Sequence, residues 1–348
     1  MDQIGQIKDI VGNAQKILII QADNPDGDSL GSALALEAIL HELGKTPILY
    51  CGVDVPGYLR YLQGWDRVQT EIPHDFDASI IVDASTMSLL ERLSDSGAQG
   101  WVAAKPCIVL DHHQSVENVV PFANVLINEF TRSSAGEVIY YLAKQLGWPI
   151  PVSAGECIMT AILGDTQGLT NQLAKVDTYR AMTELVELGV DRPSLEEKRR
   201  EASKMQLEIY KYKGRLIERT EFAYDGKIAL VHIPQDEINT YSPLYNPGPL
   251  VQGDMLQTMG VQVAVVFKEY TDGRVTGAIR SNPGYGMAAD LAKHLGGGGH
   301  AFASGFKDVS GKPFNEIKSE CIRYASELLA KIEEEKPDET VQYAYQTD

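Results

Sequence analysis

Four short segments of the sequence carry acidic or histidine side chains directly after apolar runs. They are NPDGDS (24–29), IIVDAS (80–85), VLDHHQ (109–114) and ILGDTQG (162–168). Carboxylate oxygens with a few imidazoles are a ligand set that suits Mn²⁺. Two such ions roughly 3.5–4 Å apart clamp the attacking and leaving oxygens of an in-line displacement at phosphorus. The pattern therefore indicates a divalent-metal site that acts on phosphoesters.

Each segment has a plainer interpretation when it is taken singly. Pro-Asp-Gly-Asp is typical of a surface turn, Asp83 could simply end a strand, and Asp165 could be a helix-end or turn residue. The triplet Asp111-His112-His113 is more specific, because the chain has only seven histidines and two adjacent ones follow an apolar run. The combination of the four segments, in this order, is what favours the metal site.

The elements that would position these residues alternate along the first half of the chain. Strands are predicted at 16–23, 47–51, 79–85 and 107–113, and helices at 29–43, 134–146 and 153–163. Strands that alternate with helices predict a parallel sheet covered on both faces. Ligands of such sheets bind beyond the carboxyl ends of the strands, and the acidic segments after the first, third and fourth predicted strands fall there.

The second half of the chain has a different pattern. A helical stretch at 194–219, rich in Lys, Arg and Glu, is interpreted as a linker whose basic residues fit a solvated helix face better than a nucleic-acid surface. Beyond it, strands are predicted at 227–233, 261–268 and 274–281, and helices at 286–294 and 313–333. We therefore predict a domain at 1–190, a helical linker at 191–220, a smaller α/β domain at 221–335 and a tail at 336–348.

Composition narrows the function classes. The chain has 348 residues and a net charge of −17, which argues against a protein that coats long DNA, since that task needs a basic face. It has no apolar run near the ~18 residues of a membrane span, and its first residues do not resemble a signal peptide. The four cysteines are scattered without a CxxC pair, so disulfides are not expected. We therefore expect a cytoplasmic location.

These motifs together resemble the DHH phosphoesterase superfamily, which includes RecJ-like nucleases, oligoribonuclease/pAp phosphatases and cyclic-dinucleotide phosphodiesterases. NPDGDSLGS, VDAS, DHH and GDTQG stand for the four motifs of its first domain. GAIRS (277–281) and GGGGHAFASGF (296–306) resemble the DHH-associated domain of RecJ-like and oligoribonuclease members. The resemblance covers about residues 14–330 and implies an α/β fold of two domains, a parallel-sheet DHH domain and a smaller α/β DHH-associated domain. It argues against inorganic pyrophosphatases, whose second domain differs.

The resemblance also implies roles for the residues of the first domain. The implied metal ligands are Asp26, Asp28, Asp83, His112 and Asp165. Asp83 would bridge two Mn²⁺ ions, with Asp26 serving one and the other three ligands completing the second; Mg²⁺ is an alternative. Asp111 would orient the ring of His112, and His113 would face the scissile phosphate. The ions would generate hydroxide from water near neutral pH.

In the second domain, the resemblance implies a substrate-binding site. Its candidate residues are Arg280, Ser281, Gly297, Gly298, Gly299 and His300. The glycine run would form a loop whose backbone N–H groups approach an anion, and Arg280 would bind the far phosphate of the substrate. The plainer interpretations are a flexible linker for the glycines and a surface salt bridge for Arg280. Ser133 and Ser134, before the helix at 134–146, are most simply N-cap residues.

One position departs from the family pattern. The first motif normally begins with a histidine three residues before the proline, and here that position is Ala22. Three interpretations follow: two ions, with water, Asp23 or Gln21 filling the gap; one firmly bound ion and a second that arrives with substrate; or a weakened or inactive enzyme. The first two are favoured, because the other metal-binding motif residues are intact.

The sequence therefore predicts an enzyme that hydrolyses short oligonucleotides or small nucleotides: nanoRNA, 3′-phosphoadenosine 5′-phosphate (pAp), or linear and cyclic dinucleotides. A cleft between two domains and an acidic surface favour small substrates. One alternative is a RecJ-like single-strand exonuclease, and another is a catalytically weakened nucleotide sensor, which Ala22 supports. A homodimer is expected only by analogy with the family.

Overall fold

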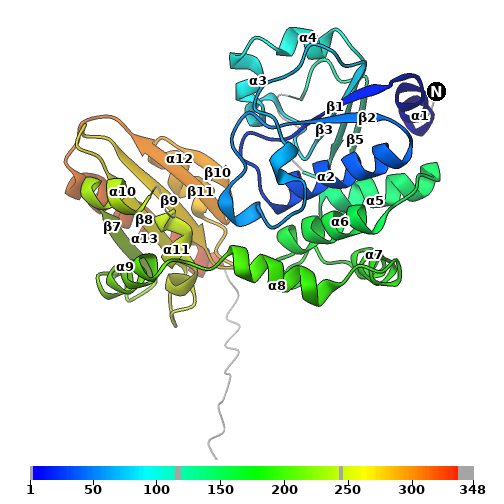
Figure 1. Ribbon diagram of the computed structural model, residues 1–348. Helices are drawn as coiled ribbons and strands as arrows, with labels where there is room; N and C mark the ends of the chain where they lie inside the picture. The colour runs from blue at the N-terminus through cyan, green and yellow to red at the C-terminus, as the bar shows by residue number, and fades with distance from the viewer. Residues whose placement is uncertain (1–2, 114–118, 243–245, 336–348) are drawn as a thin grey trace, which may run out of the picture. The chain divides into compact units, whose positions relative to one another are not determined.

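The computed structural model describes residues 3–113, 119–242 and 246–335. The chain divides between Lys204 and Met205 into two compact units (Figure 1). The tail predicted at 336–348 lies outside the described residues. Over these residues, no helix has the length and apolar character that a membrane crossing requires. All four cysteines are described, and each is buried and free.

The N-terminal unit is built on a parallel sheet, which confirms the predicted fold class. Its described strands are β1 (Lys16–Ile20), β2 (Thr46–Tyr50), β3 (Ala78–Val82), β4 (Cys107–Asp111) and β5 (Val125–Asn128), in the order β2-β1-β3-β4-β5. The first, third and fourth strands end at or before the acidic motifs, because the polar residues leave the sheet at its carboxyl edge. β5 was not predicted; its four residues are too few to show an alternating pattern.

Helices cover both faces of this sheet (Figure 1). One face packs against α1 (Gln3–Asn13), α2 (Gly27–Glu42), α5 (Ala135–Leu146) and α6 (Val152–Asp165), and the other against α3 (Glu91–Asp95) and α4 (Gln99–Ala103). Alternation along β1 shows the two layers, since Ile17 and Ile19 lie in the core on the α2 side while Leu18 and Ile20 lie in the core on the other side. Short 3₁₀ turns lie at Gly57–Leu59 (η1), Trp65–Arg67 (η2) and Met87–Leu89 (η3), and α7 (Val176–Glu187) and α8 (Arg192–Ala202) complete the unit.

The strand order places a ligand site at a definite point. The chain passes from β1 outward to β2 and then returns to β3 on the other side of β1, so the connections leave β1 and β3 in opposite directions. Such a switch point opens a crevice beyond the carboxyl ends of the two strands. The segment 24–29 follows β1 and Asp83 follows β3, so both acidic motifs lie at the switch point.

Two glycines allow the helices beside this crevice to pack closely. A Cβ atom at Gly31 of α2 would lie 2.6 Å from the backbone oxygen of Cys157 in α6. A Cβ atom at Gly136 of α5 would lie 2.4 Å from the Cβ of Ala161, also in α6. Only glycine at these two positions permits the observed approach, and this approach brings the start of α2 near the end of α6.

The C-terminal unit is a second α/β structure with a mixed sheet. Its described strands are β6 (Glu221–Ala223), β7 (Ile228–Ile233), β8 (Val263–Glu269), β9 (Val275–Ser281), β10 (Gly298–His300) and β11 (Ala303–Asp308), in the order β10-β11-β9-β8-β7-β6. Its described helices are α9 (Leu207–Glu218), α10 (Gln235–Tyr241), α11 (Pro247–Leu256), α12 (Ala288–His294) and α13 (Phe314–Glu335). The single helical stretch expected at 194–219 is two helices, α8 in the first unit and α9 in the second, separated by residues 203–206.

Candidate metal centre

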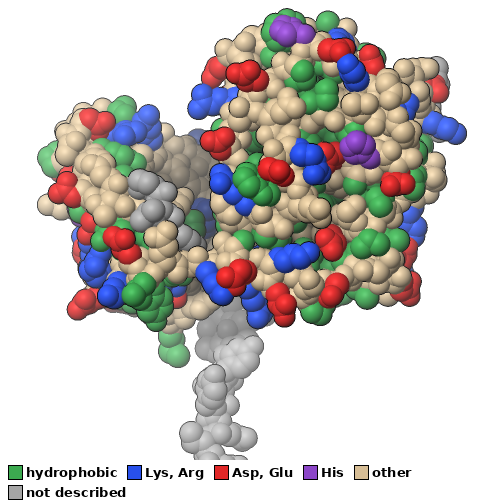
Figure 2. Space-filling model, viewed as in Figure 1, with side chains coloured by type: hydrophobic (Ala, Val, Ile, Leu, Met, Phe, Trp, Pro, Cys, Tyr) green, Lys and Arg blue, Asp and Glu red, His purple; other side chains and the backbone are tan. Residues whose placement is uncertain are grey.

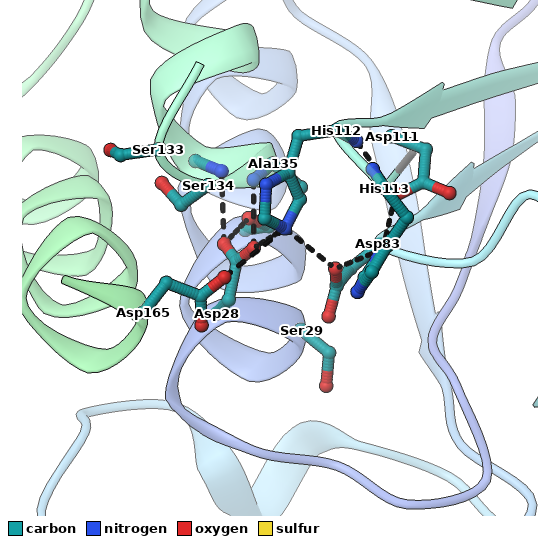
Figure 3. Close-up of polar contacts among 12 residues, drawn as sticks. Asp28, Ser29, Asp83, Asp111, His112, His113, Ser133, Ser134, Ala135 and Asp165 are labelled. Atoms are coloured by element: carbon teal, nitrogen blue, oxygen red, sulfur yellow. Dashed lines mark hydrogen bonds and ion pairs between the residues drawn. The ribbon is translucent and has the colours of Figure 1, made fainter. Parts of the chain in front are cut away.

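The imidazole of His112 stands among three carboxylates at the carboxyl edge of the N-terminal sheet (Figure 3). Its Nε2 atom lies 3.1 Å from Asp165 Oδ2, 3.3 Å from Asp28 Oδ2 and 3.6 Å from Asp83 Oδ1. The four side chains come from the end of β4, the end of α6, the first turn of α2 and the end of β3. The structure thus brings together four of the five predicted metal ligands.

Asp28 is fixed by the amino terminus of another helix. Its Oδ2 accepts a hydrogen bond of 2.7 Å from the backbone N–H of Ala135, and its Oδ1 accepts one of 3.0 Å from Gly136 and one of 2.9 Å from the Ser32 hydroxyl. These backbone donors are the first of α5, where the helix dipole favours an anion. Ser134 caps α5 as expected, by accepting from the backbone N–H of Glu137. The carboxylate of Asp28 therefore occupies the anion-binding amino terminus of α5.

Asp83 is held in an uncommon backbone conformation. Its φ angle is +57°, in the left-handed region that costs most non-glycine residues about 1 kcal/mol or more. This turn at the end of β3 aims the side chain between His112 and His113, whose ring Nδ1 lies 3.6 Å from Asp83 Oδ1. Burial and the charge of Asp28 raise the pKa of Asp83 well above its usual range. Such crowding of like charge is typical of a site that binds a cation.

The donor set fits a divalent metal ion. Within the described residues, Asp83 Oδ1 and His112 Nε2 are buried and have no hydrogen-bond partner. Burial by itself would lower the pKa of His112, but the carboxylates of Asp165, Asp83 and Asp28 raise it, so a proton takes the place that a cation would fill. Three carboxylates supply hard oxygen ligands and one imidazole supplies a nitrogen ligand. This combination suits Mn²⁺ or a similar ion.

Asp111 has a different partner from the one expected. Its Oδ1 lies 2.8 Å from Nδ1 of His113 and accepts hydrogen bonds from the backbone N–H groups of His112 and His113, while its Oδ2 accepts from the N–H of Ser85. Burial alone would raise the pKa of Asp111, but these hydrogen bonds hold it well below its usual range. Asp111 therefore orients the ring of His113 and not that of His112, because the His112 ring points away from it toward α2 and α6 (Figure 3).

Asp26 binds backbone N–H groups through one oxygen of its carboxylate. It is the N-cap of α2, and its Oδ1 accepts from the backbone N–H groups of Asp28 and Ser29 at 3.0 Å each. Ser29 Oγ accepts in return from the N–H of Asp26, which completes a capping box. Among described residues, the groups of side chains close enough to share an ion contain Asp83, Asp111, His112 and His113 in one case, and Asp28, His112 and Asp165 in the other. Asp26 is in neither group.

Ala22 is buried and packs in the apolar core on the α3 side of the sheet. Of the two neighbours considered as substitute ligands, Asp23 already accepts a hydrogen bond of 2.8 Å from the N–H of Arg92. Gln21 is fully buried, and neither atom of its amide has a hydrogen-bond partner in the part of the chain that the structure describes. Alternation along β1 directs Gln21 to the α2 face and Ala22 to the opposite one. The position of the usual histidine is therefore filled by apolar packing.

The glycine run of the C-terminal unit is not the loop that was expected. Residues 298–300 form the short edge strand β10, paired with β11 in a hairpin. Gly299 has a φ angle of +138°, and a Cβ atom at Gly297 would lie 2.1 Å from the backbone oxygen of Gly305. These two glycines are thus required by the hairpin itself, whereas Gly298 has open space around it. The side chain of His300 lies outside the described part of the structure.

The other predicted substrate residues lie on β9. Arg280 is half-buried, and its guanidinium donates to the backbone oxygen of Ile279 at 3.0 Å. Within the described residues it forms no ion pair, so the salt-bridge interpretation finds no partner there. Ser281 is buried, and its hydroxyl donates to the carbonyl of Ala301, which leaves only its lone pairs for a ligand. Arg280 and Ser281 belong to the C-terminal unit and the His112 cluster to the N-terminal unit, so the structure does not place them in one site.

Sequence reasoning missed the donors that hold the carboxylates in place. The N–H groups of Ala135 and Gly136 bind Asp28 from 107 and 108 residues away, and the N–H of Ser85 binds Asp111. Backbone donors have no sequence signature of their own. The Ser-Ser-Ala-Gly-Glu segment signalled the start of a helix, but nothing in it identified the carboxylate that the helix would bind.

Comparison with known proteins agrees with the resemblance seen in the motifs. A family model described as the DHH family, N-terminal domain, matches residues 16–162. The bifunctional oligoribonuclease and PAP phosphatase NrnA of Thermus thermophilus is 24% identical over 285 residues, which cover 81% of this chain and 81% of that protein.

Two solved structures are similar in fold. An exopolyphosphatase-related protein from Bacteroides fragilis, 22% identical, has a TM-score of 0.81 and covers 94% of this chain and 97% of its own. The exonuclease RecJ bound to manganese, 17% identical, has a TM-score of 0.51 and covers 93% of this chain and 94% of its own. At these identities the likeness concerns the fold alone.

Proposed function

Since this chain belongs to the DHH superfamily of phosphoesterases and is a phosphoester hydrolase, we propose that it cleaves short oligonucleotides or small nucleotides with Mn²⁺. The observation that supports the proposal most strongly is the convergence of three carboxylates on Nε2 of His112, where two buried ligand atoms lack hydrogen-bond partners among the described residues. A bound ion would satisfy those atoms and compensate the charge of the carboxylates.

Each residue of the cluster has a role in this proposal. Asp28, Asp83, His112 and Asp165 would hold one ion. Asp83 would also be a ligand of a second metal position near Asp26, which has fewer protein ligands. When bound, Mn²⁺ supplies the Lewis acidity that makes hydroxide from water available near neutral pH. The amino terminus of α5 keeps Asp28 in place during turnover.

His113 is the residue proposed to contact the scissile phosphate. Its side chain is 38% exposed, whereas that of His112 is 7% exposed, so only His113 is open to a ligand from solvent. The hydrogen bond between its Nδ1 and Asp111 fixes the ring and leaves Nε2 to donate to a phosphate oxygen. This arrangement positions a donor where negative charge develops in the transition state.

Small substrates are favoured over long nucleic acid for two reasons. The relative NrnA is named as an oligoribonuclease and PAP phosphatase, and it is similar to this chain over most of both lengths. The net charge of −17 disfavours a long polyanion, and acidic and basic side chains are interspersed over the face drawn in Figure 2. We therefore propose di- to pentanucleotides, pAp or dinucleotides as substrates.

The test compares substrates of different length under one set of conditions. Purified protein with Mn²⁺ is given a 5′-phosphorylated RNA dinucleotide, an RNA pentamer, pAp and long single-stranded DNA, and initial rates are measured by chromatography. The proposal expects kcat/KM to be highest for one of the small substrates. Faster degradation of long DNA than of every small substrate would instead support a RecJ-like exonuclease.

A second candidate function, a nucleotide sensor without turnover, has one observation in its favour. Ala22 stands where the family has a metal-binding histidine, and it is packed in an apolar core rather than near a replacement ligand. A calorimetric titration with Mn²⁺ gives the number of ions bound, and the hydrolysis assay shows whether they support turnover. If the wild type binds nucleotide without hydrolysing it, and Ala22→His restores hydrolysis, the sensor is favoured over the enzyme.

A further inference from the structure

A cavity in the N-terminal unit lies beside the metal-binding motifs, and none of the predicted site residues that the structure describes lines it. Its volume is about 490 Å³, within the range of roughly 300–1,000 Å³ typical of small-molecule sites. Its lining includes Gly27, which lies between Asp26 and Asp28, and Gly164, which precedes Asp165. We call this cavity the α8 pocket, because α8 forms its outer wall.

The inner wall of the α8 pocket is backbone. The Cα atom of Gly164 lies 3.9 Å from where a Cβ atom at Gly27 would stand, so the start of α2 and the end of α6 are in contact there. Neither glycine projects a side chain into the cavity. A ligand in the pocket can therefore approach the two helix ends that carry Asp28 and Asp165.

An aromatic ring stands beside this inner wall. Tyr58, in η1, is 51% exposed, and its hydroxyl lies 3.5 Å from the carbonyl oxygen of Pro25 in the first motif. Its neighbour Leu59 is buried and anchors the turn, so the fold places Tyr58 although about half of this residue is exposed. An exposed tyrosine ring in this cavity offers a platform on which a nucleic-acid base can stack.

Arginines of α8 make the outer wall cationic. Arg199 donates to Glu196 at 2.9 and 2.8 Å, Arg200 donates to the same carboxylate at 2.8 Å, and Arg192 lies 3.5 Å from it. Three guanidinium groups on one carboxylate leave a local excess of positive charge on an acidic chain; Figure 2 shows basic and acidic side chains side by side over α8. Arg192 and Arg199 line the cavity, whereas Arg200 does not and its side chain is 75% exposed.

We infer that the α8 pocket binds one nucleoside monophosphate unit of the substrate, with the base on Tyr58 and the phosphate at Arg192 and Arg199. The planar forks of the two arginines match phosphate geometry, and the glycine wall keeps this unit next to the metal centre. The identification of the ligand as a nucleotide rests on the proposed function. The site itself lies within the N-terminal unit and is separate from the residues predicted on β9 and β10.

The test measures binding without turnover. Calorimetry of the full chain in EDTA with adenosine 5′-monophosphate (AMP), adenosine and inorganic phosphate as separate ligands reports the site in the absence of metal. We expect AMP to bind more tightly than either of its parts. Tyr58→Ala should raise the Kd for AMP about tenfold while Tyr58→Phe leaves it nearly unchanged, because stacking needs only the ring.

The arginines provide a matched pair for the phosphate. Arg192→Gln should raise the Kd for AMP about tenfold, whereas Arg200→Gln removes the same charge from the same carboxylate without touching the cavity and should change Kd less than about twofold. For adenosine, neither substitution should matter. Circular dichroism confirms that each variant is folded.

Three results would overturn the inference: no binding of AMP to the wild-type chain, equal Kd values for the Tyr58→Ala and wild-type proteins, or equal effects of the Arg192 and Arg200 substitutions. Binding of phosphate alone with the affinity of AMP would also contradict it, since it would show an anion site without a nucleoside. AMP binding is measured in EDTA, without turnover, so it does not depend on hydrolysis. A failed hydrolysis assay would therefore not contradict a measured AMP affinity. Conversely, normal hydrolysis with no AMP binding would reject the pocket and keep the proposed function.

Discussion

Replacing Gly31 by alanine tests how the metal centre is assembled. The new Cβ atom would lie 2.6 Å from the backbone oxygen of Cys157, well inside the roughly 3.5 Å at which nonbonded atoms are in contact. The oxygen belongs to the interior of α6, so it cannot rotate away as a side chain could. To relieve the clash, α2 and α6 must separate, and that movement carries Asp28 away from Asp165.

The expected effect on stability combines two opposing terms. Alanine is favoured over glycine in a helix by about 1 kcal/mol, while overpacking a core costs about 1–3 kcal/mol. Because a rigid backbone atom is involved, we expect the upper end of the overpacking cost and a net loss of about 2 kcal/mol. For a unit of this size that corresponds to a fall in Tm of roughly 4–8 °C.

The assay is thermal unfolding followed by circular dichroism, with a Mn²⁺ titration of the folded variant. Gly12→Ala is the matched control, because it makes the same change in helix α1 with no heavy atom within 4 Å of the new Cβ. The control should be as stable as the wild type or slightly more stable, with unchanged Mn²⁺ affinity. If Gly31→Ala behaved like Gly12→Ala in both measurements, the close packing of α2 on α6 would not be what positions the site.

Three further predictions concern the cluster itself. Asp28→Asn should lower stability by about 1–3 kcal/mol in chemical denaturation and Mn²⁺ affinity by more than about tenfold, because an amide cannot accept from all the donors of α5 and Ser32; unchanged affinity would remove Asp28 from the ligand set. Asp111→Asn should lower kcat about 10–100-fold with little change in Mn²⁺ affinity, since its side chain orients His113; a matching loss of metal would show that it orients His112 instead. Mn²⁺ binding near pH 7 should release at least one proton, measured by calorimetry in buffers of different ionisation enthalpy, because the raised pKa values of His112 and Asp83 favour protonated forms that the metal displaces. Affinity should accordingly rise with pH, and an absence of proton release would contradict the assignment of His112.

The fold of the N-terminal unit was largely predictable because its strands are apolar runs that end at polar motifs. β1, β3 and β4 were each predicted with their acidic residues at the carboxyl end, and the switch-point rule then places those residues together. α5 was predicted nearly to the residue by its serine cap and by Gly147. Strand ends and helix caps of this kind are set by residues that are adjacent in the chain, so a single sequence is enough to predict them.

What the sequence did not reveal depends on distant partners. The hydrogen bond from Ala135 to Asp28 crosses 107 residues, and the partner of Asp111 depends on how the chain turns after β4. Asp26 is predicted to be a metal ligand, with a surface turn as the plainer interpretation, and the structure shows that one oxygen of its carboxylate caps α2. The glycine run is predicted to be a loop that approaches an anion through its backbone N–H groups, whereas pairing with β11 makes residues 298–300 an edge strand.

The most direct test of the central claim is the rate of Mn²⁺-dependent hydrolysis of a 5′-phosphorylated adenosine dinucleotide by the wild type and by Asp83→Ala. Asp83 is the carboxylate between the two histidines, and its substitution removes the ligand that both metal positions would share. We predict turnover by the wild type that EDTA abolishes and Mn²⁺ restores, and no turnover by a folded Asp83→Ala variant. Equal rates for the two proteins would show that the cluster around His112 is not the catalytic site.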